Sequence, residues 1–333
     1  WKQEIDKEEI MKKANNQKAA VIAIGAVVLA AILPFFISNN YHLNLMIQVL
    51  INIIIVVGLN FITGLTGQMS LGTAGIFSMG AYTSSLLATK AGVNPWICLI
   101  AAVGMGILIG ICLGYPSLRI SGVYLALTTI GFSEIVRILM TNMTELTGGA
   151  LGVTGIPAFS IFGFQLRSNK QFYYVYLIIA VILIFNAYRL VHSKWGRAFL
   201  AVKDNPDAVE AGGVNIAKIK ILAFTMASVY AAIAGSLYAH YVGFINPSAY
   251  NVEFSINYVV MLVIGGIGSV PGNVLGAILV TLVPEFLRFM ENYYWLVFSI
   301  ITLLFVIFLP NGIISVFKPR KREGETEKGG MNH

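Results

Sequence analysis

Two pairs of oppositely charged residues interrupt stretches that are otherwise apolar. Glu134 lies three residues before Arg137, and Glu285 lies three residues before Arg288. Residues with this spacing share one face of a helix, so each pair can form a local salt bridge that lowers the cost of burying its charges. The alternative is a proton relay, since acidic side chains inside membranes carry protons in ion-coupled transporters. We favour structural ion pairs, which weakens the case for ion coupling.

Other side chains that could take part in catalysis are scattered. The histidines show no metal-ligand spacing, and no cysteine or carboxylate cluster lies near them in the sequence: they are His42, His192, His240 and His333. The chain has neither a G-x-S-x-G elbow nor a G-x-x-x-x-G-K-[ST] phosphate loop. Cys98 and Cys112 would lie about 21 Å apart on one helix, too far for a disulfide. We expect no catalytic residue, no metal site and no bound cofactor, so that any ATP is used by a partner.

The composition is that of a membrane protein. Of the 333 residues, 57% are hydrophobic and 11% are charged, and the mean hydropathy is +0.79. Segments of about 20 apolar residues cross a bilayer as helices, because lipid cannot pair exposed backbone groups. We predict an all-α polytopic membrane protein with about ten transmembrane helices, some of them broken or re-entrant. The predicted spans are 20–37, 43–62, 68–89, 95–115, 119–140, 172–191, 219–242, 254–270, 272–290 and 293–309.

The distribution of basic residues predicts the topology. With the N-terminus in the cytoplasm, most of the 22 Lys and Arg fall on the inner side, as the positive-inside rule requires. Membrane topology thus explains the net charge of +7, and we expect no nucleic-acid partner. The predicted parts are a cytoplasmic tail at 1–18, a single transmembrane domain at 19–310 and a cytoplasmic tail at 311–333. Within the domain, loop 141–171 faces outward and loop 192–218 faces the cytoplasm.

Glycines gather in two segments, from Gly64 to Gly80 and from Gly265 to Gly276. Close packing of helices through small residues explains such clusters. They also mark interrupted helices whose exposed backbone lines a cavity, and the two interpretations are compatible. Corresponding breaks suggest two halves related by an internal repeat, although residue identity between the halves is too low to establish one.

A pathway through the bundle would be lined by polar side chains at mid-membrane depth. For each candidate taken alone, a hydrogen bond between helices is the competing explanation. The candidates are Asn52, Asn60, Thr63, Gln68, Ser70, Thr128, Thr129 and Asn257.

The most informative stretch runs from Lys194 to Ala239, where a charged segment separates two spans. Asn205 is placed to cap a short helix, with Pro206 in its first turn and with Asp207 and Glu210 near its positive end. Gly212 and Gly213 then end this helix, and Asn215 is placed to cap the next one, which begins at Ile216. We predict a short amphipathic helix that lies across the membrane surface, although a plain solvated loop is the alternative.

Four segments together resemble the branched-chain amino acid permeases of ATP-binding-cassette (ABC) importers. They are GLNFITGLTGQMSLGTAGIFSMGAYTSSLL, GFSEIVRILMTNMTELTGGALGVTGIP, DNPDAVEAGGVNIAKIKILAFTMASVYAAIAGSLYAH and VVMLVIGGIGSVPGNVLGAILVTLVPE. The third resembles the coupling segment of that family, with Glu210, Ala211 and the following glycines at the matching positions, although Gly212 stands where many relatives have alanine. The resemblance covers residues from about Leu43 to Pro310 and is strongest to the LivM-type subunit.

The resemblance implies a permease subunit in a bacterial or archaeal cytoplasmic membrane, with both termini in the cytoplasm. Its partners would be a second, LivH-type permease, two cytoplasmic ATPases that use ATP and Mg, and a substrate-binding protein outside. The ATPase-coupling residues would be Asn205, Pro206, Asp207, Glu210, Ala211, Gly212 and Gly213. The cargo would be leucine, isoleucine and valine or related amino acids, moved inward by alternating access. Alternatives are a permease for urea or short amides, an ion-coupled secondary transporter or channel, and a structural scaffold.

Overall fold

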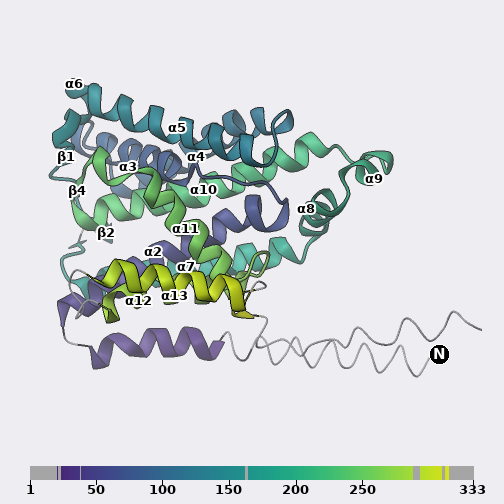
Figure 1. The fold of residues 1–333 in the computed structure, drawn as a ribbon. Coiled ribbons are helices and arrows are strands. Elements are labelled where there is room, and N and C mark those ends of the chain that lie inside the picture. The colour runs from purple at the N-terminus through teal and green to yellow at the C-terminus, as the bar shows by residue number, and fades with distance from the viewer. Residues whose placement is uncertain are drawn as a thin grey trace, which may run out of the picture.

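The computed structural model describes residues 21, 24–37, 39–161, 164–287, 293–309 and 312–314. These residues form a bundle of helices that run roughly side by side (Figure 1). The short helices α8 (Lys194–Asp204) and α9 (Pro206–Ala211) lie at one end of the bundle, while α6 (Thr144–Thr147) and the strands lie at the other (Figure 1). We call these two ends the α9 end and the α6 end.

Each of the ten predicted spans corresponds to a helix. In chain order these are Ile24–Phe36, α2 (Asn40–Leu59), α3 (Thr73–Lys90), α4 (Pro95–Gly114), α5 (Val123–Asn142), α7 (Asn169–Val191), α10 (Ile216–Val242), α11 (Val252–Gly265), α12 (Val270–Phe286) and α13 (Tyr294–Phe308). Among the residues that the structure describes, five helices are long and apolar enough to cross a bilayer: α2 with its extension to Leu65, α4 with its extension to Leu118, α5, α7 and α10. The prediction of an all-α polytopic membrane protein is confirmed.

Several predicted boundaries were wrong, and glycines and prolines explain most of the differences. The span predicted at 68–89 begins as a helix only at Thr73, because 66–72 is not helical. The span predicted to start at 119 begins at Val123, after the 3₁₀ helix η2 (Pro116–Leu118) and a turn at Gly122. The span predicted at 254–270 ends at Gly265, where Gly266 adopts a positive φ of 112°.

Polar residues cap many of the helices, so several boundaries are set by local sequence. Asn94 accepts a hydrogen bond from the Trp96 amide at the start of α4. Ser168 and Gln171 form a capping box at the start of α7. These side chains satisfy amide groups that the first helical turn leaves without an intrahelical acceptor.

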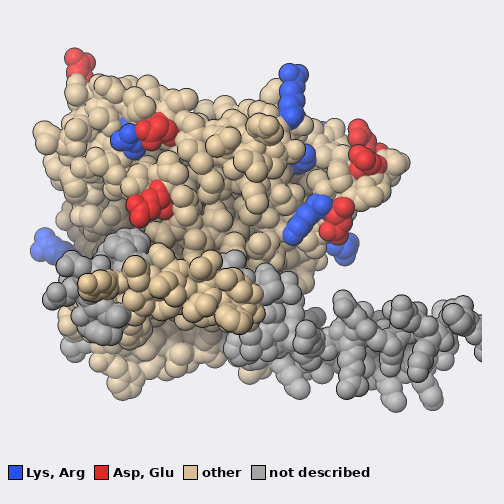
Figure 2. Space-filling model, in the orientation of Figure 1, with Lys and Arg blue, Asp and Glu red and all other residues tan. Residues whose placement is uncertain are grey.

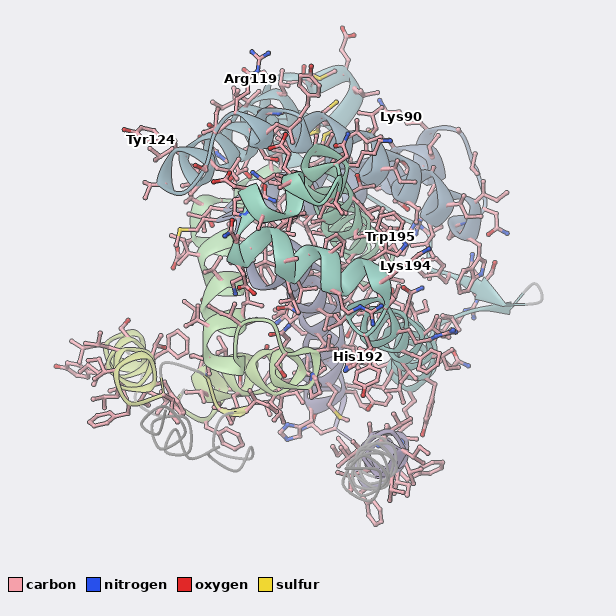
Figure 3. All side chains as sticks on the ribbon, turned by 90° about the vertical axis from the view of Figure 1, so that its right-hand side faces the viewer. Lys90, Arg119, Tyr124, His192, Lys194 and Trp195 are labelled. Carbon is pink, nitrogen blue, oxygen red and sulfur yellow. The ribbon has the colours of Figure 1, made fainter. Side chains whose placement is uncertain are left out.

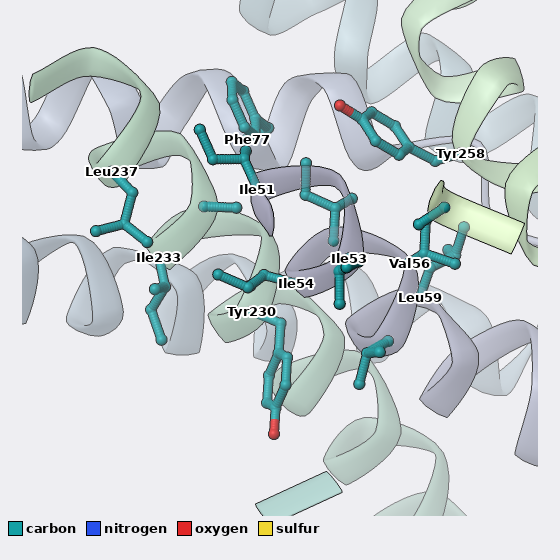
Figure 4. Close-up of a cluster of buried hydrophobic side chains, with 14 of the residues drawn as sticks. Ile51, Ile53, Ile54, Val56, Leu59, Phe77, Tyr230, Ile233, Leu237 and Tyr258 are labelled. Carbon is teal, nitrogen blue, oxygen red and sulfur yellow. The ribbon is translucent and has the colours of Figure 1, made fainter. Parts of the chain in front are cut away.

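The core of the bundle lies around α2 and α10. Ile51 and Ile54 of α2 are fully buried and pack in one cluster with Tyr230 and Leu237 of α10 and Phe77 of α3 (Figure 4). In their most apolar windows, α2 is 83% buried and α10 is 67% buried, whereas α5 is 28% buried and α7 is 22% buried. The two inner helices are therefore surrounded by protein, and α5 and α7 lie at the periphery.

Close helix contacts depend on glycine at two positions where α3 meets α10. A Cβ atom at Gly235 would lie 2.1 Å from the carbonyl oxygen of Phe77, and one at Gly80 would lie 2.5 Å from the backbone of Ala232. No side chain fits at these distances, so both glycines let the two backbones approach each other. The packing interpretation of the first glycine cluster is thus correct at Gly80.

The long connection at 141–171 contains ordered elements at the α6 end. After α6 come a 3₁₀ turn, η3 (Gly149–Leu151), and strand β1 (Val153–Thr154), which pairs with β4 (Phe244–Ile245). Strands β2 (Ser160–Ile161) and β3 (Phe164–Gln165) form a second antiparallel pair. The buried His240 of α10 contacts this connection, since its Nδ1 lies 2.6 Å from the Pro157 carbonyl oxygen and its Nε2 lies 2.8 Å from Ser84 Oγ.

Candidate functional site: the α8–α9 segment and the interrupted helices

The α8–α9 segment has the capping that the sequence predicted. Asn205 Oδ1 accepts a hydrogen bond of 3.1 Å from the Ala208 amide at the start of α9. Asn215 Oδ1 accepts one of 3.0 Å from the Lys218 amide at the start of α10. Gly213 follows α9 with a φ of 78°, a left-handed conformation that favours glycine.

The preceding helix, α8, was not predicted, and it fastens the segment to the bundle. Phe199 and Val202 are buried in the core cluster. Gly196 packs so closely on the end of α7 that a Cβ there would lie 1.9 Å from the Val191 carbonyl oxygen. Viewed from the α9 end, Trp195 and Lys194 at the start of α8 lie near the centre, with His192 close by (Figure 3).

In contrast to α8, α9 projects away from the bundle. Asp207, Ala208, Glu210 and Ala211 are exposed, and no residue of α9 is buried. Acidic and basic side chains gather at this end of the molecule, beside a largely uncharged surface (Figure 2). The coupling residues predicted from the sequence, Asn205 to Gly213, therefore form one exposed projection, which is attached to the bundle through the partly buried helix α8.

The first interrupted helix lies between α2 and α3. The last turns of this span form the π-helix η1 (Asn60–Leu65), after which 66–72 runs without helical structure to Thr73. A π-helical turn inside an α-helix is uncommon and often marks a functional position. The Nζ atom of Lys203, in α8, donates a hydrogen bond of 3.0 Å to the Gly64 carbonyl oxygen in η1. The α8–α9 segment thus contacts the interrupted helix directly.

Hydroxyl groups from distant helices satisfy the backbone where α3 begins. The Leu71 amide donates to Thr129 Oγ1 at 2.9 Å, the Ala74 amide to Ser255 Oγ at 2.9 Å and the Gly75 amide to Ser133 Oγ at 3.1 Å. An unpaired amide in a membrane interior costs several kcal/mol, so these acceptors make a helix start inside the bundle tolerable. They come from α5 and α11, which therefore hold the break in place.

The second interruption, between α11 and α12, packs against the first. Gly268 adopts a φ of 86°, and its amide donates a hydrogen bond of 2.8 Å to Asn60 Oδ1. Both glycine clusters lie at breaks between helices, as the sequence predicted, and the structure adds that the two breaks touch. That their backbone lines a cavity stays a prediction. Their shapes differ, because the first contains an extended stretch and the second is a tight turn.

The structure brings together four of the eight pathway candidates. Asn60, Thr63, Gln68 and Ser70 all lie in the first break. Among the described residues, no partner is found for the buried atoms Asn60 Nδ2, Thr63 Oγ1 and Gln68 Oε1. These are polar groups with unused hydrogen-bonding capacity inside the bundle.

Of the other four candidates, Thr129 of α5 accepts the hydrogen bond from the Leu71 amide beside this break, and the remaining three lie elsewhere. Thr128 is exposed on α5 and donates to the Tyr124 carbonyl of its own helix. Asn257 is half-buried on α11. Asn52 joins three helices, because it hydrogen-bonds Thr281 of α12 and Tyr258 of α11. A pathway role for each of these residues remains a prediction.

The first predicted ion pair forms within α5. Arg137 Nε donates to Glu134 Oε2 at 2.9 Å, and a second bond joins Arg137 Nη2 to Glu134 Oε1. In the second predicted pair, Glu285 lies on α12, whereas Arg288 falls outside the described residues.

Cys98 and Cys112 are free cysteines. Within the described part of the chain, no group of three His, Cys, Asp or Glu residues is arranged to hold a metal ion.

Sequence reasoning missed Lys203, Ser133 and Ser255. Lys203 stood among the charges of the α8–α9 segment, and the two serines stood in largely apolar helices, where Glu134 beside Ser133 drew attention to itself instead. A weak signal existed for the serines, since a hydroxyl side chain in a transmembrane segment commonly hydrogen-bonds another helix. Their partners could not be chosen from sequence.

Sequence comparisons place this arrangement in a known class of membrane transport subunits. Residues 41–307 match the family described as "Branched-chain amino acid transport system / permease component". The chain belongs to this permease family, and it is a transport subunit, not an enzyme. Permeases of ABC transporters work with ATPase and substrate-binding proteins.

Curated relatives come from bacteria and archaea. The chain is 33% identical over 328 residues to the high-affinity branched-chain amino acid transport system permease protein LivM of Escherichia coli, covering 92% of this chain and 76% of that protein. It is 26% identical to a probable LivM of Methanocaldococcus jannaschii, covering 73% of this chain and 77% of that protein. It is 25% identical to the fructose import permease protein FrcC of Rhizobium meliloti, covering 86% and 82%. No solved structure is significantly similar to the chain.

Proposed function

We propose that this chain is the membrane permease subunit of an ABC importer that moves leucine, isoleucine and valine, or chemically related amino acids, into the cell. The cargo class rests on the names of relatives in two domains of life, of which the bacterial one is 33% identical over 92% of this chain. The more distant sugar permease shares only 25% identity, so an amino acid is the better-supported cargo than a sugar.

The observation that carries the mechanism is the hydrogen bond between Lys203 and Gly64. An importer must transmit motion from ATPases in the cytoplasm to the spans that open and close the pathway. In our proposal, two ATPases bind α9 through Asp207, Glu210 and the glycines that follow them. Helix α8 is packed into the bundle and is hydrogen-bonded to η1 through Lys203. A movement of α9 would therefore displace α8 and, through this one hydrogen bond, the interrupted helix.

The interrupted helices are then the moving parts of the pathway. The Asn60–Gly268 hydrogen bond ties the two breaks together, so that displacement of η1 also displaces the turn between α11 and α12. Asn60, Thr63 and Gln68 offer polar atoms to a solute at this point. During alternating access, groups of helices would move as rigid bodies about these breaks and open the polar site to one side of the membrane and then to the other.

The remaining partners and the orientation belong to the same proposal. The α9 end faces the cytoplasm, a substrate-binding protein delivers cargo to the α6 end, and a second permease of LivH type completes the transmembrane unit. The chain lies in the cytoplasmic membrane with both tails, 1–18 and 311–333, inside. ATP and Mg are used by the ATPase subunits.

Reconstitution of the complex in proteoliposomes tests this function. The permease would be purified with a second permease, two ATPases and the binding protein, which are expected from the same gene cluster. We expect ATP hydrolysis to increase when leucine-loaded binding protein is added and leucine uptake to require ATP. Uptake by this chain alone, driven by an ion gradient, would instead establish a secondary transporter. Binding of urea or a short amide, but not leucine, by the binding protein would change the cargo.

A further inference from the structure

The ion pair of α5 lies on the outer surface of the bundle, about halfway along its helix. Glu134 is 11 residues from the start of α5, which at 1.5 Å per residue is about 16 Å along a helix of about 30 Å. The Glu134 side chain is 39% exposed and that of Arg137 is 32% exposed. In the region of α5, Figure 2 shows acidic and basic side chains touching within a largely uncharged surface.

Such a position is unfavourable against lipid. A charged side chain at the bilayer centre costs at least about 2.5–3.5 kcal/mol, and such residues almost always face protein or a water-filled cavity. Pairing reduces this cost without removing it, because a salt bridge in hydrocarbon still loses the solvation of two charges. In the described spans, Glu134 is the one charged residue that lies more than two turns from both ends of its helix.

A row of residues at helical spacing continues the exposed surface on both sides of the pair. Leu127, Gly131, Glu134 and Ile138 follow one another at i, i+4, i+7 and i+11, and we call this row the Glu134 face. Leu127 is 58% exposed and Ile138 is 47% exposed. A Cβ atom at Gly131 would have no neighbour within 4 Å, so none of the residues that the structure describes covers this point of the face.

The same surface opens into a hollow at the α9 end. Arg119, Ser121, Tyr124, Leu127 and Thr128 line a hollow of about 500 Å³ at the start of α5. Arg119 and Tyr124 project away from the bundle there (Figure 3). Polar side chains therefore lie beside the start of α5, and Glu134 and Arg137 add charge near its middle. Charge at that depth makes this a poor surface for lipid and a good one for protein.

Helix α4 supplies an internal comparison. Ile100, Gly104, Ile107 and Ile111 have the same spacing and are exposed in the same way, and Gly104 also has no neighbour within 4 Å of a Cβ. That row is entirely apolar and suits lipid. The two faces differ mainly in one position, where α4 has Ile107 and α5 has Glu134.

We propose that the Glu134 face of α5 is the surface on which the second permease subunit docks, and that the Glu134–Arg137 pair lies in this protein interface. The inference rests on the proposed pairing of two permeases. In this arrangement an axis along the membrane normal relates the two permeases, so that the second subunit presents its own α5 at the same depth. Each ion pair would then be shielded from lipid by the other chain, and Gly131 would allow the two helices to approach closely.

Photo-crosslinking in the intact complex tests the proposal. Benzoylphenylalanine would replace Leu127 or Ile138 on α5, and Ile100 or Ile111 on α4, in the complex assembled with its permease and ATPase partners in membranes. We expect crosslinks to the second permease from both α5 positions and only lipid adducts from α4. Lipid adducts alone at α5, or equal crosslinking from the two helices, would overturn the proposal.

A steric variant gives an independent measurement. Gly131→Trp has room within this chain, so it should fold, yet it should reduce the amount of second permease that co-purifies by at least about tenfold. Gly104→Trp is the matched control and should leave assembly unchanged. Equal assembly of the two variants would contradict the docking surface. If the unaltered chain fails to co-purify with any second permease, the proposed function fails, whereas an intact complex with an unlinked α5 refutes only this inference.

Discussion

The Nζ atom of Lys203 lies 3.0 Å from the carbonyl oxygen of Gly64, and the two residues are 139 positions apart in the chain. Lys203 belongs to α8, in the exposed segment between two spans, and Gly64 belongs to the π-helix η1 that ends the central span. Gly67, just beyond η1, lies against the stem of the same lysine, where a Cβ would be 3.0 Å from Lys203 Cγ. The charged segment and the first break in the bundle thus form one mechanical unit.

Replacing this lysine should uncouple ATP hydrolysis from transport. Lys203→Met keeps the length of the side chain but removes the charged donor, and hydrogen bonds of charged groups contribute about 1.5–3 kcal/mol. We expect the ratio of amino acid uptake to ATP hydrolysis in proteoliposomes to fall about tenfold or more, while ATP hydrolysis itself continues. Lys194→Met, at the other end of α8, is the control and should keep the normal ratio. The same ratio in both variants would exclude a coupling role for the bond.

The contact between the two breaks should contribute to stability. Asn60→Leu keeps the branching of the side chain but leaves the Gly268 amide without its acceptor, and an unsatisfied buried donor costs about 1–3 kcal/mol. The midpoint of thermal unfolding in detergent should therefore decrease, and transport should decrease with it. Asn142→Leu is the comparison, because Asn142 is exposed and donates only to the Ile138 carbonyl of its own helix. An unchanged midpoint for Asn60→Leu would show that another acceptor reaches Gly268.

The close approach of α3 and α10 should not tolerate even one methyl group. Gly235→Ala would place a Cβ 2.1 Å from the Phe77 carbonyl oxygen, and overpacking of this kind costs about 1–3 kcal/mol or more. We expect a lower yield of folded protein and a lower unfolding midpoint. Gly104→Ala has open space around its Cβ and should be neutral or slightly stabilising, since alanine favours helix over glycine. Equal stability of the two variants would contradict the tight packing.

His240 should hold the long connection at the α6 end against the bundle. His240→Phe keeps the ring contact with Phe159 but removes the bonds to Pro157 and Ser84. Loss of these bonds should lower the free energy of local unfolding of the connection by about 1–3 kcal/mol. The amides of Ile156 and Leu166, which donate to the Gly243 and Phe159 carbonyls, should then exchange with deuterium at least about tenfold faster. His192→Phe, at the other end of the molecule, is the control and should leave these rates unchanged. Unaltered exchange in His240→Phe would show that the strand pairs hold the connection without it.

The sequence by itself determined the membrane class, the ten apolar helices and the caps at Asn205 and Asn215. These features depend on the composition of a window of about 20 residues or on a side chain within three positions of the amide that it binds. Both glycine clusters were also recognisable as breaks, because glycine is the residue that permits a positive φ, as at Gly268. The family resemblance, carried by four segments in order, is confirmed by the match of residues 41–307 to the permease family.

Only the tertiary structure decided which polar groups meet. Lys203 reaches Gly64, Asn60 reaches Gly268, and Ser255 reaches the start of α3, across separations of 139, 208 and 181 residues. A serine or a lysine has the same local signal whether its partner is water, lipid headgroup or a distant amide, so no pattern in the sequence selects among them. The packing of the helices selects the partner. It buries the backbone groups that the helix breaks leave without a hydrogen bond and brings a side chain from another helix within reach of them.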